Sequence, residues 1–459
     1  MTIRSMQAWM WALPCVALLI FGAALRWPTL EPQDNYLSFA SGRLAYSDVV
    51  AFYAADNPMP YLKRNIEYPV LTGMTLWLTG FMPDGNKGYF LANALILSAA
   101  LLGCLGYLAL SGSPARLMYF ALAPGLAFYS VLNWDALGLL GLVAAAYYMR
   151  RQRLGWAGAS LAFGTSAKLF PVFVLPVLWA HTMHGTEFPP RQKNFAGMLK
   201  WVFSPASRRF LTSFVVVMLV LNLPLAIVNP RGWSYFLSFQ AGRTSNLDSI
   251  WQHLPPIPDQ AQSLLFALLF LGGILWLTLC VLRSDRWEVA TLLSLLLFLL
   301  FTKVYSPQYD LWVLPLLALV ACPLGLWITY VLADVAYYWA VFFFYYIYAG
   351  GTSRIDVDTA GTFVGAAVWL REFALALLFI WGLHRLTAAL RSPKARSFLA
   401  RTIEALSNNT REVRHLRLAV EELQIELAAL RKAAASHEVM DRQRQNQTCQ
   451  AAVDKSNVE

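Results

Sequence analysis

The chain has 459 residues, of which 58% are hydrophobic and only 14% are charged, and its formal net charge is +10. Soluble proteins contain about 45–50% apolar and about 25% charged residues, so this composition excludes a soluble enzyme, a secreted disulfide scaffold and a disordered chain. Uncharged apolar runs such as 88–110 and 264–282 are long enough to span a bilayer. The sequence therefore predicts an all-α, polytopic membrane protein.

The positive charge is unevenly distributed along the chain. Basic residues exceed acidic ones in segment 181–210 and in the tail 386–459, whereas acidic residues exceed basic ones in segment 27–67. This asymmetry is typical of membrane topology, with basic loops on the cytoplasmic side, and we expect no nucleic-acid partner. We expect segment 9–25 to be retained as the first span, because no small-residue cleavage site follows it.

The apolar segments predict about twelve crossings of the plasma membrane with both termini cytoplasmic. Segment 156–181 counts as two short helices that meet outside, because Pro171 interrupts it. Segment 69–82 is too short to cross and is expected to be re-entrant or interfacial; the simpler alternative, in which it crosses, places 150–153 outside. The expected spans are 9–25, 89–110, 117–132, 134–149, 156–181, 210–228, 264–282, 288–301, 310–322, 324–348 and 361–384.

The tail 391–459 is expected to be a cytoplasmic module separate from the membrane domain 1–390. Apolar residues alternate in steps of three and four between Val413 and Leu430, over about three heptads. This pattern favours a coiled coil at about 404–434, which would form a homo-oligomer or bind a protein partner. A lone amphipathic helix is the alternative.

With this topology, the polar residues of the chain collect on the outer side. The outer segments are 27–88, the turn 133–135, the loop 229–260 and the junction 303–309. In the first of them, Asp48 lies in the aromatic sequence YSDVVAFY, which ends at Tyr53. A carboxylate in a partly apolar pocket can act as a general base. A solvated loop acid or a helix N-cap is the alternative for Asp48.

The sequence EYPVLTG at 67–73 opens the short apolar segment. A proline and an acid suit the first turn of a helix, which accounts for Glu67 structurally. Tyr68 is also a candidate for stacking on a sugar or contacting a lipid phosphate.

Lys168 and Lys303 are each the only charge in a long apolar stretch, 156–180 and 289–309 respectively. A lone buried cation is costly, so such a residue usually faces a cavity and has an anionic partner. A lipid-linked phosphate at the outer membrane edge is a suitable partner. Snorkelling of the ammonium group to the interface is the alternative.

Other polar residues mark the same side as a substrate site. Ser306, Gln308 and Tyr309 follow Lys303 at the start of the next span. The loop 229–260 is a candidate acceptor lid. Its polar residues include Arg243, Asp248, Trp251 and His253.

Two charged positions fall in the middle of late spans. Asp334 lies within 324–348, and Arg371-Glu372 lies within 361–383. A buried pair between Asp334 and Arg371 is favoured over a proton or ion relay. The sequence contains no Gly-rich phosphate loop, no Ser/His/Asp order and no His/Cys metal cluster, so we expect no cofactor and no metal site.

Together these motifs resemble the integral-membrane glycosyltransferases of the GT-C fold, with family 87, the polyprenol-phosphate-mannose-dependent mannosyltransferases, as the closest group. The resemblance covers roughly residues 10–385. The motifs that carry it are SD at 47–48 with Tyr53, EYPVLTG at 67–73, NWD at 133–135, KLFP at 168–171, and Lys303 with SPQY at 306–309 and Trp312.

The resemblance implies an inverting transfer of a sugar, mannose in this family, from a polyprenyl-phosphate donor to a cell-envelope glycan or glycolipid at the extracytoplasmic face. It implies that Asp48 is the catalytic base, and positive charge from Lys168, Lys303 or Arg243 would stabilise the leaving phosphate. The turn at Asn133 and Asp135 departs from the Gly-Gln-type turn of relatives, so a second acidic residue and a metal requirement stay open. The rival hypotheses are a lipid or solute transporter that uses Asp334, Arg371 and Lys303, and an inactive membrane scaffold acting through its tail.

Overall fold

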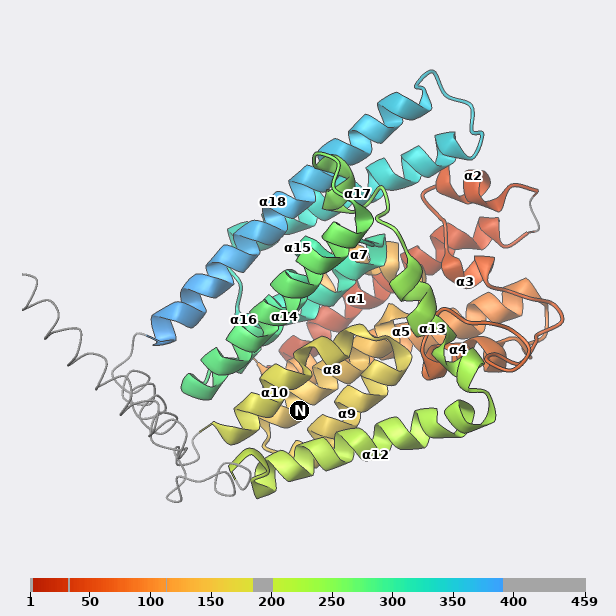
Figure 1. The fold of residues 1–459 in the computed structure, drawn as a ribbon. Helices are drawn as coiled ribbons and strands as arrows, with labels where there is room; N and C mark the ends of the chain where they lie inside the picture. Colours follow the sequence, from red (N-terminus) through yellow and green to blue (C-terminus); the bar gives the residue numbers. More distant parts are fainter. Residues whose placement is uncertain (1–2, 32–33, 113, 185–200, 391–459) are drawn as a thin grey trace, which may run out of the picture. The chain divides into compact units, whose positions relative to one another are not determined.

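The computed structural model describes residues 3–31, 34–112, 114–184 and 201–390, and the regular secondary structure of this part of the chain is helical (Figure 1). This confirms the predicted all-α class. Six helices are long and apolar enough to cross a membrane. They are α1 (Ile3–Arg26), α5 (Asn86–Ser111), α12 (Pro205–Val228), α14 (Asp259–Arg283), α17 (Leu324–Tyr348) and α18 (Val357–Leu390). The predicted coiled coil at 404–434 lies outside the described residues.

The remaining apolar helices in the described ranges are shorter than a bilayer-spanning helix. The longest of them has 16 residues, which corresponds to about 24 Å, against about 30 Å for the hydrocarbon core of a bilayer. The structure therefore gives six membrane-length helices, fewer than the expected crossings. The shorter helices are α4 (Val70–Thr79), α8 (Asp135–Arg150), α9 (Leu154–Ala167), α10 (Leu175–Met183), α15 (Trp287–Phe301) and α16 (Val313–Val320).

The expected break in segment 156–181 is present. Helix α9 ends at Ala167, and Lys168 then adopts an extended backbone conformation. The 3₁₀ helix η3 (Phe170–Val174) follows, with Pro171 in its first turn, where the missing N–H is not needed. The break places Lys168 at a helix end, where its side chain can leave the helix packing.

The expected span at 117–132 is not one continuous helix. The structure has two short helices there, α6 (Met118–Ala121) and α7 (Gly125–Tyr129). Pro124 lies between them, and its lack of an N–H prevents a continuous ladder of helical hydrogen bonds.

The helices differ in how much of their surface is buried. Helices α8, α15 and α16 are buried along most of their length and form the centre of the core. By contrast, only 11% of the apolar window of α12 is buried, although this helix packs along α9 (Figure 1). A helix with an apolar exposed surface suits a position facing lipid.

Two sets of helix ends can be told apart by their polar contacts. Arg150, at the end of α8, pairs with Glu288 at the start of α15, with 3.0 Å between Nε and Oε1. It also donates hydrogen bonds to the carbonyls of Ser111, at the end of α5, and Leu319, at the end of α16. The opposite ends of α8 and α15 therefore meet at the other end of the bundle, where Asp135 and Lys303 lie.

Candidate active site

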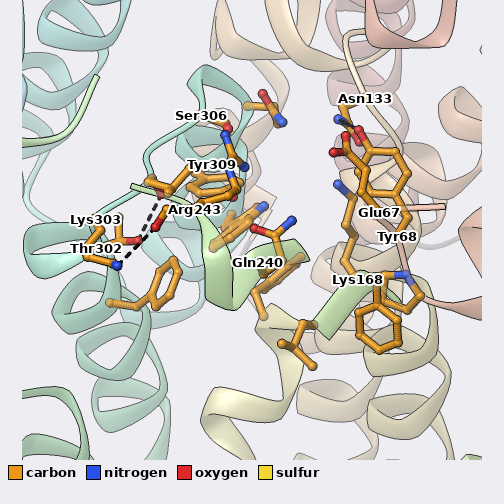
Figure 2. A pocket seen from close by; sticks show the side chains of 18 of the residues that line it. Glu67, Tyr68, Asn133, Lys168, Gln240, Arg243, Thr302, Lys303, Ser306 and Tyr309 are labelled. Atoms are coloured by element: carbon orange, nitrogen blue, oxygen red, sulfur yellow. Dashed lines mark hydrogen bonds between the residues drawn. The ribbon is translucent and has the colours of Figure 1, made fainter. Parts of the chain in front are cut away.

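A cavity of about 490 Å³ lies at this second end of the bundle (Figure 2). Its volume is within the range of small-molecule sites, about 300–1,000 Å³. It takes side chains from connections that are far apart in the sequence. The predicted site residues that line it are Asp48, Glu67, Tyr68, Asn133, Lys168, Arg243, Lys303, Ser306, Gln308 and Tyr309.

The polar lining forms two walls. Figure 2 shows Glu67, Tyr68, Asn133 and Lys168 on one side, and Arg243, Lys303 and Ser306 on the other, with Gln240 between them. We call the first side, together with Asp48, the carboxylate wall. We call the side formed by Arg243 and Lys303 the cationic wall.

Asp48 is fixed at the start of the one-turn helix α3 (Asp48–Ala51) by backbone contacts with the chain around Asn133. Its N–H donates to the carbonyl of Leu132 at 2.8 Å, and the hydroxyl of Ser47 donates to the carbonyl of Val131 at 2.5 Å. These bonds place the carboxylate beside the turn 133–135, although more than eighty residues separate the two segments in the sequence.

Both oxygens of the Asp48 carboxylate accept hydrogen bonds. The Tyr46 hydroxyl donates to Oδ1 at 3.0 Å, and the Asn133 amide donates to Oδ2 at 2.6 Å. The same amide donates to the Tyr68 hydroxyl at 3.0 Å. Tyr46 is a site residue that was not predicted, although its position two residues before Asp48 is a signal in the sequence.

Burial raises the pKa of Asp48 above its usual value. The hydrogen bonds from Asn133 and Tyr46 and the charge of Lys168 oppose this increase, and the nearby Glu67 adds to it. A carboxylate that is oriented by two donors and is more basic than an ordinary aspartate is suited to accept a proton from a hydroxyl group.

Lys168, on the carboxylate wall, has an internal anionic partner. Its Nζ lies 3.1 Å from Oδ2 of Asp135, which is fully buried. The ammonium group also lies 4.3 Å from the centroid of the Tyr68 ring, a cation–π distance. Asp135 itself does not line the cavity, so its position is behind the wall and its contact is with Lys168.

The cationic wall has no such partner. Lys303 Nζ donates to the backbone carbonyl of Arg243 at 3.1 Å. Within the described ranges, neither side chain has a carboxylate at ion-pair distance. Two half-buried cations that have no carboxylate partner in the described ranges are suited to an anionic group such as a phosphate.

Aromatic side chains line the space between the walls, and the sequence analysis missed most of them. Phe170 and Tyr309 stack on Trp312, with ring centroids 4.0 and 4.2 Å apart respectively. Trp312 donates to Oδ1 of Asp135 at 2.7 Å. Stacked rings with a polar edge are suited to the faces of a sugar. Further aromatic lining comes from Phe173, Phe236, Phe266 and Phe298.

Some predicted site residues do not line the cavity. Tyr53 lies at a smaller hollow beside Arg64 and packs on Tyr89. Trp251 donates to the carbonyl of Phe301 at 2.8 Å, and a ring nitrogen of His253 lies 2.8 Å from the carbonyl oxygen of Leu247.

Asp248 is buried behind the cationic wall rather than exposed in a lid. Burial raises its pKa to about 6, against the opposing charge of Arg371 and a hydrogen bond from Tyr345. These polar groups of the loop bond to the protein rather than line the cavity, and the role of the loop as an acceptor lid stays a prediction.

The expected buried pair between Asp334 and Arg371 is also not present. Arg371 forms its ion pair with its neighbour Glu372, with 2.7 Å between Nη2 and Oε1. Asp334 instead accepts a hydrogen bond from the Tyr129 hydroxyl. Neither Asp334 nor Arg371 lines the cavity.

The described residues include no group of three or more His, Cys, Asp or Glu side chains arranged to hold a metal ion. The cavity combines an oriented carboxylate, two cations without carboxylate partners and an aromatic surface. Comparisons with protein-family models, with curated proteins and with solved structures found no match for this chain.

Proposed function

We propose that this protein is a glycosyltransferase that moves a sugar from a polyprenyl-phosphate donor to an acceptor hydroxyl, with Asp48 as the general base. The observation that carries the proposal is the presence of Asp48 and the cations Arg243 and Lys303 in one cavity. The motif resemblance to family 87 of the GT-C glycosyltransferases gives mannose as the donor sugar and a cell-envelope glycan or glycolipid as the acceptor.

In the proposed reaction, the carboxylate wall supplies the base and the cationic wall stabilises the leaving phosphate. Asp48 takes the proton of the acceptor hydroxyl, and the acceptor oxygen attacks the anomeric carbon from the side opposite the phosphate. The bond from that carbon to the phosphate oxygen breaks, so the configuration is inverted. Arg243 and Lys303 stabilise the negative charge that develops on the leaving polyprenyl phosphate.

Lys168 was expected from the sequence to bind the donor phosphate, but this proposal does not give it that role. Its ion pair with Asp135 neutralises it, so the donor phosphate is assigned to the cationic wall. Glu67, Tyr68, Asn133 and the other lining residues then contact the sugars. We propose that the aromatic lining accommodates the sugar and the first isoprenoid unit of the donor.

The proposed membrane arrangement follows from the positions of the two helix ends. We place the cavity outside and the Arg150 end in the cytoplasm of a plasma-membrane protein, as the basic residues 150–153 favour. The short helices then complete about twelve crossings with both termini cytoplasmic. The tail is proposed to oligomerise through its coiled coil or to bind a protein partner.

Purified full-length protein in lipid nanodiscs, supplied with radiolabelled polyprenyl-phosphate mannose and envelope lipids, tests this function. Transfer of label to the acceptor supports the proposal if Asp48→Asn abolishes it while Asp56→Asn, an exposed carboxylate in the same outer segment, leaves it unchanged. Undiminished transfer by Asp48→Asn would contradict the assigned base. In sealed vesicles, movement of the labelled lipid or of a solute without transfer would favour the transporter instead.

A further inference from the structure

A buried polar cluster lies behind the cationic wall, outside the cavity lining. Its centre is Arg371 of α18, whose side chain is fully buried. The Nη2 group donates to Oε1 of Glu372 at 2.7 Å and to the backbone carbonyl of Asp248 at 2.8 Å. The cluster is absent from the mechanism proposed above, because none of these groups reaches the cavity.

The guanidinium of Arg371 also contacts the rings of Tyr305 and Tyr337, which are perpendicular to each other. Its central carbon is 3.5 Å from the centroid of Tyr305 and 4.3 Å from that of Tyr337. Cation–π contacts with buried rings are stronger than those at the surface. A planar guanidinium can contact a ring and donate from Nη2 to Glu372 and Asp248 at the same time, which the single ammonium group of a lysine does not reproduce.

The cationic wall itself is built from two chain segments, 243–253 and 301–305. The Asn246 side chain joins them, because its amide donates to the carbonyl of Tyr305 at 2.6 Å and its oxygen accepts the N–H of Tyr305 at 3.0 Å. The N–H of Asn246 also donates to the carbonyl of Lys303 at 3.2 Å. Ser249 adds a bond from its hydroxyl to the carbonyl of Thr302 at 2.8 Å.

Each of these two segments supplies one cation of the wall. Segment 243–253 carries Arg243, and segment 301–305 carries Lys303. Arg371 contacts both segments, through the carbonyl of Asp248 in the first and the ring of Tyr305 in the second. Arg371 therefore bridges the two segments that carry the cations.

Burying the charged side chain of Arg371 costs free energy. In the described part of the chain, its Nε and Nη1 atoms have no hydrogen-bond partner. Replacing a buried ion pair with well-packed apolar residues is often neutral or stabilising, so stability alone does not account for the guanidinium. An arrangement that fixes two segments of a binding site does account for it.

We propose that Arg371, held by Glu372, is a positioning residue that sets the spacing of Arg243 and Lys303 for the donor phosphate. This inference rests on the proposed function for the identity of the donor. It adds a residue from a helix that contributes no side chain to the cavity, and it predicts a defect confined to the phosphate part of the ligand.

Binding of farnesyl phosphate and of farnesol to the full-length protein in nanodiscs tests the positioning role. The two probes share the isoprenoid chain and differ in the phosphate. We expect Arg371→Met to weaken farnesyl phosphate binding on the order of tenfold, a difference of about 1.4 kcal/mol, and to leave farnesol binding unchanged. Arg371→Lys keeps the charge and loses the planar contact with the rings, so we expect an intermediate loss of farnesyl phosphate binding in a protein that thermal unfolding shows to be folded.

Arg385→Met is the matched control, because Arg385 lies on the same helix and donates to the carbonyl of Val320 at the opposite end of the bundle. It should bind both probes as the wild type does. Wild-type phosphate binding in both Arg371 variants, or an equal loss of both probes in Arg371→Lys, would overturn the positioning role.

The transfer assay separates this inference from the proposed function. Where transfer occurs, Arg371→Lys should raise the KM for the donor with little change in the KM for the acceptor. Phosphate-selective binding that depends on Arg371, without transfer, would overturn the glycosyltransferase and keep the positioning role. Transfer with a donor KM that does not change in the Arg371 variants would support the glycosyltransferase and overturn the positioning role. A wild-type protein that does not bind farnesyl phosphate would contradict both proposals.

Discussion

Lys168 and Asp135 form a buried ion pair, with 3.1 Å between Nζ and Oδ2, at the edge of the cavity. The other carboxylate oxygen of Asp135 accepts a hydrogen bond from Trp312, so both oxygens have a partner. The pair places one lysine of the site in a structural role on the carboxylate wall. Lys303 has no comparable partner in the described ranges, so the two lysines of the cavity differ in their surroundings.

The first prediction concerns the stability of this pair. Lys168→Met leaves a buried carboxylate without its cation, and we expect a loss of about 3–5 kcal/mol in the free energy of unfolding. Lys168→Met combined with Asp135→Asn removes both charges and should recover most of that loss. Thermal unfolding of the purified wild type and of the two variants measures the effect. Equal destabilisation of the single and double variants would show that the ion pair does not determine stability at this site.

The second prediction concerns the pH dependence of transfer. Asp48 must be ionised to act as a base, so the rate should fall as the pH falls through its pKa. Tyr46→Phe removes a donor that favours the ionised form, which raises the pKa further. We expect the acidic limb of the rate profile to move to higher pH by about one unit.

Tyr36→Phe is the control for Tyr46→Phe. The Tyr36 hydroxyl donates to the backbone carbonyl of Ser47 rather than to the carboxylate of Asp48. The acidic limb of the Tyr36→Phe rate profile should coincide with that of the wild type. A Tyr46→Phe profile that does not move, or that moves to lower pH, would contradict the role of Asp48 as the titrating base.

Local sequence signals predicted several of these features, and long-range packing determined the others. The helix break at Lys168 was predictable because Pro171 and a lone charge mark it within four residues. The partner of Lys168 was not predictable from the sequence, because Asp135 becomes its neighbour only when α8 packs on η3. The same limit applies to Arg371, whose contact with Asp248 joins residues 123 positions apart.

The expected single helix over 117–132 failed for a different reason. Its residues are apolar throughout, and hydropathy alone does not distinguish one helix from two short ones at a proline. The cavity residues Phe236 and Gln240 were not predicted. They lie on α13 (Pro230–Gly242), inside the loop 229–260 that was expected to be an acceptor lid. Aromatic residues are so frequent in this chain that their presence alone does not mark a site.

The third prediction tests the assignment of the donor phosphate. Lys303→Gln removes a cation of the cationic wall, and we expect the KM for the donor to rise on the order of tenfold while the KM for the acceptor stays the same. Lys63→Gln, an exposed lysine in the outer segment 27–88, should leave both values unchanged. A rise in the acceptor KM alone would place the phosphate on the other wall.

The fourth prediction concerns helix α9, which directly precedes Lys168. Helix α9 packs so closely on α12 that a Cβ on Gly158 would lie 2.1 Å from the carbonyl oxygen of Phe210. A backbone atom cannot rotate away, so Gly158→Ala must separate the two helices. We expect a loss of about 1–3 kcal/mol in the free energy of unfolding, measured by thermal unfolding of the purified protein.

Gly106→Ala is the matched control, because a Cβ there meets no atom within 4 Å and the residue is exposed on α5. This change should stabilise the protein by about 0.5–1 kcal/mol, since alanine costs less backbone entropy than glycine in a helix. Lys168 follows the last residue of α9, so a displaced α9 should also disturb the carboxylate wall. Gly158→Ala should therefore lower the transfer rate more than Gly106→Ala does, and an unchanged rate would show that Lys168 keeps its place without this helix contact.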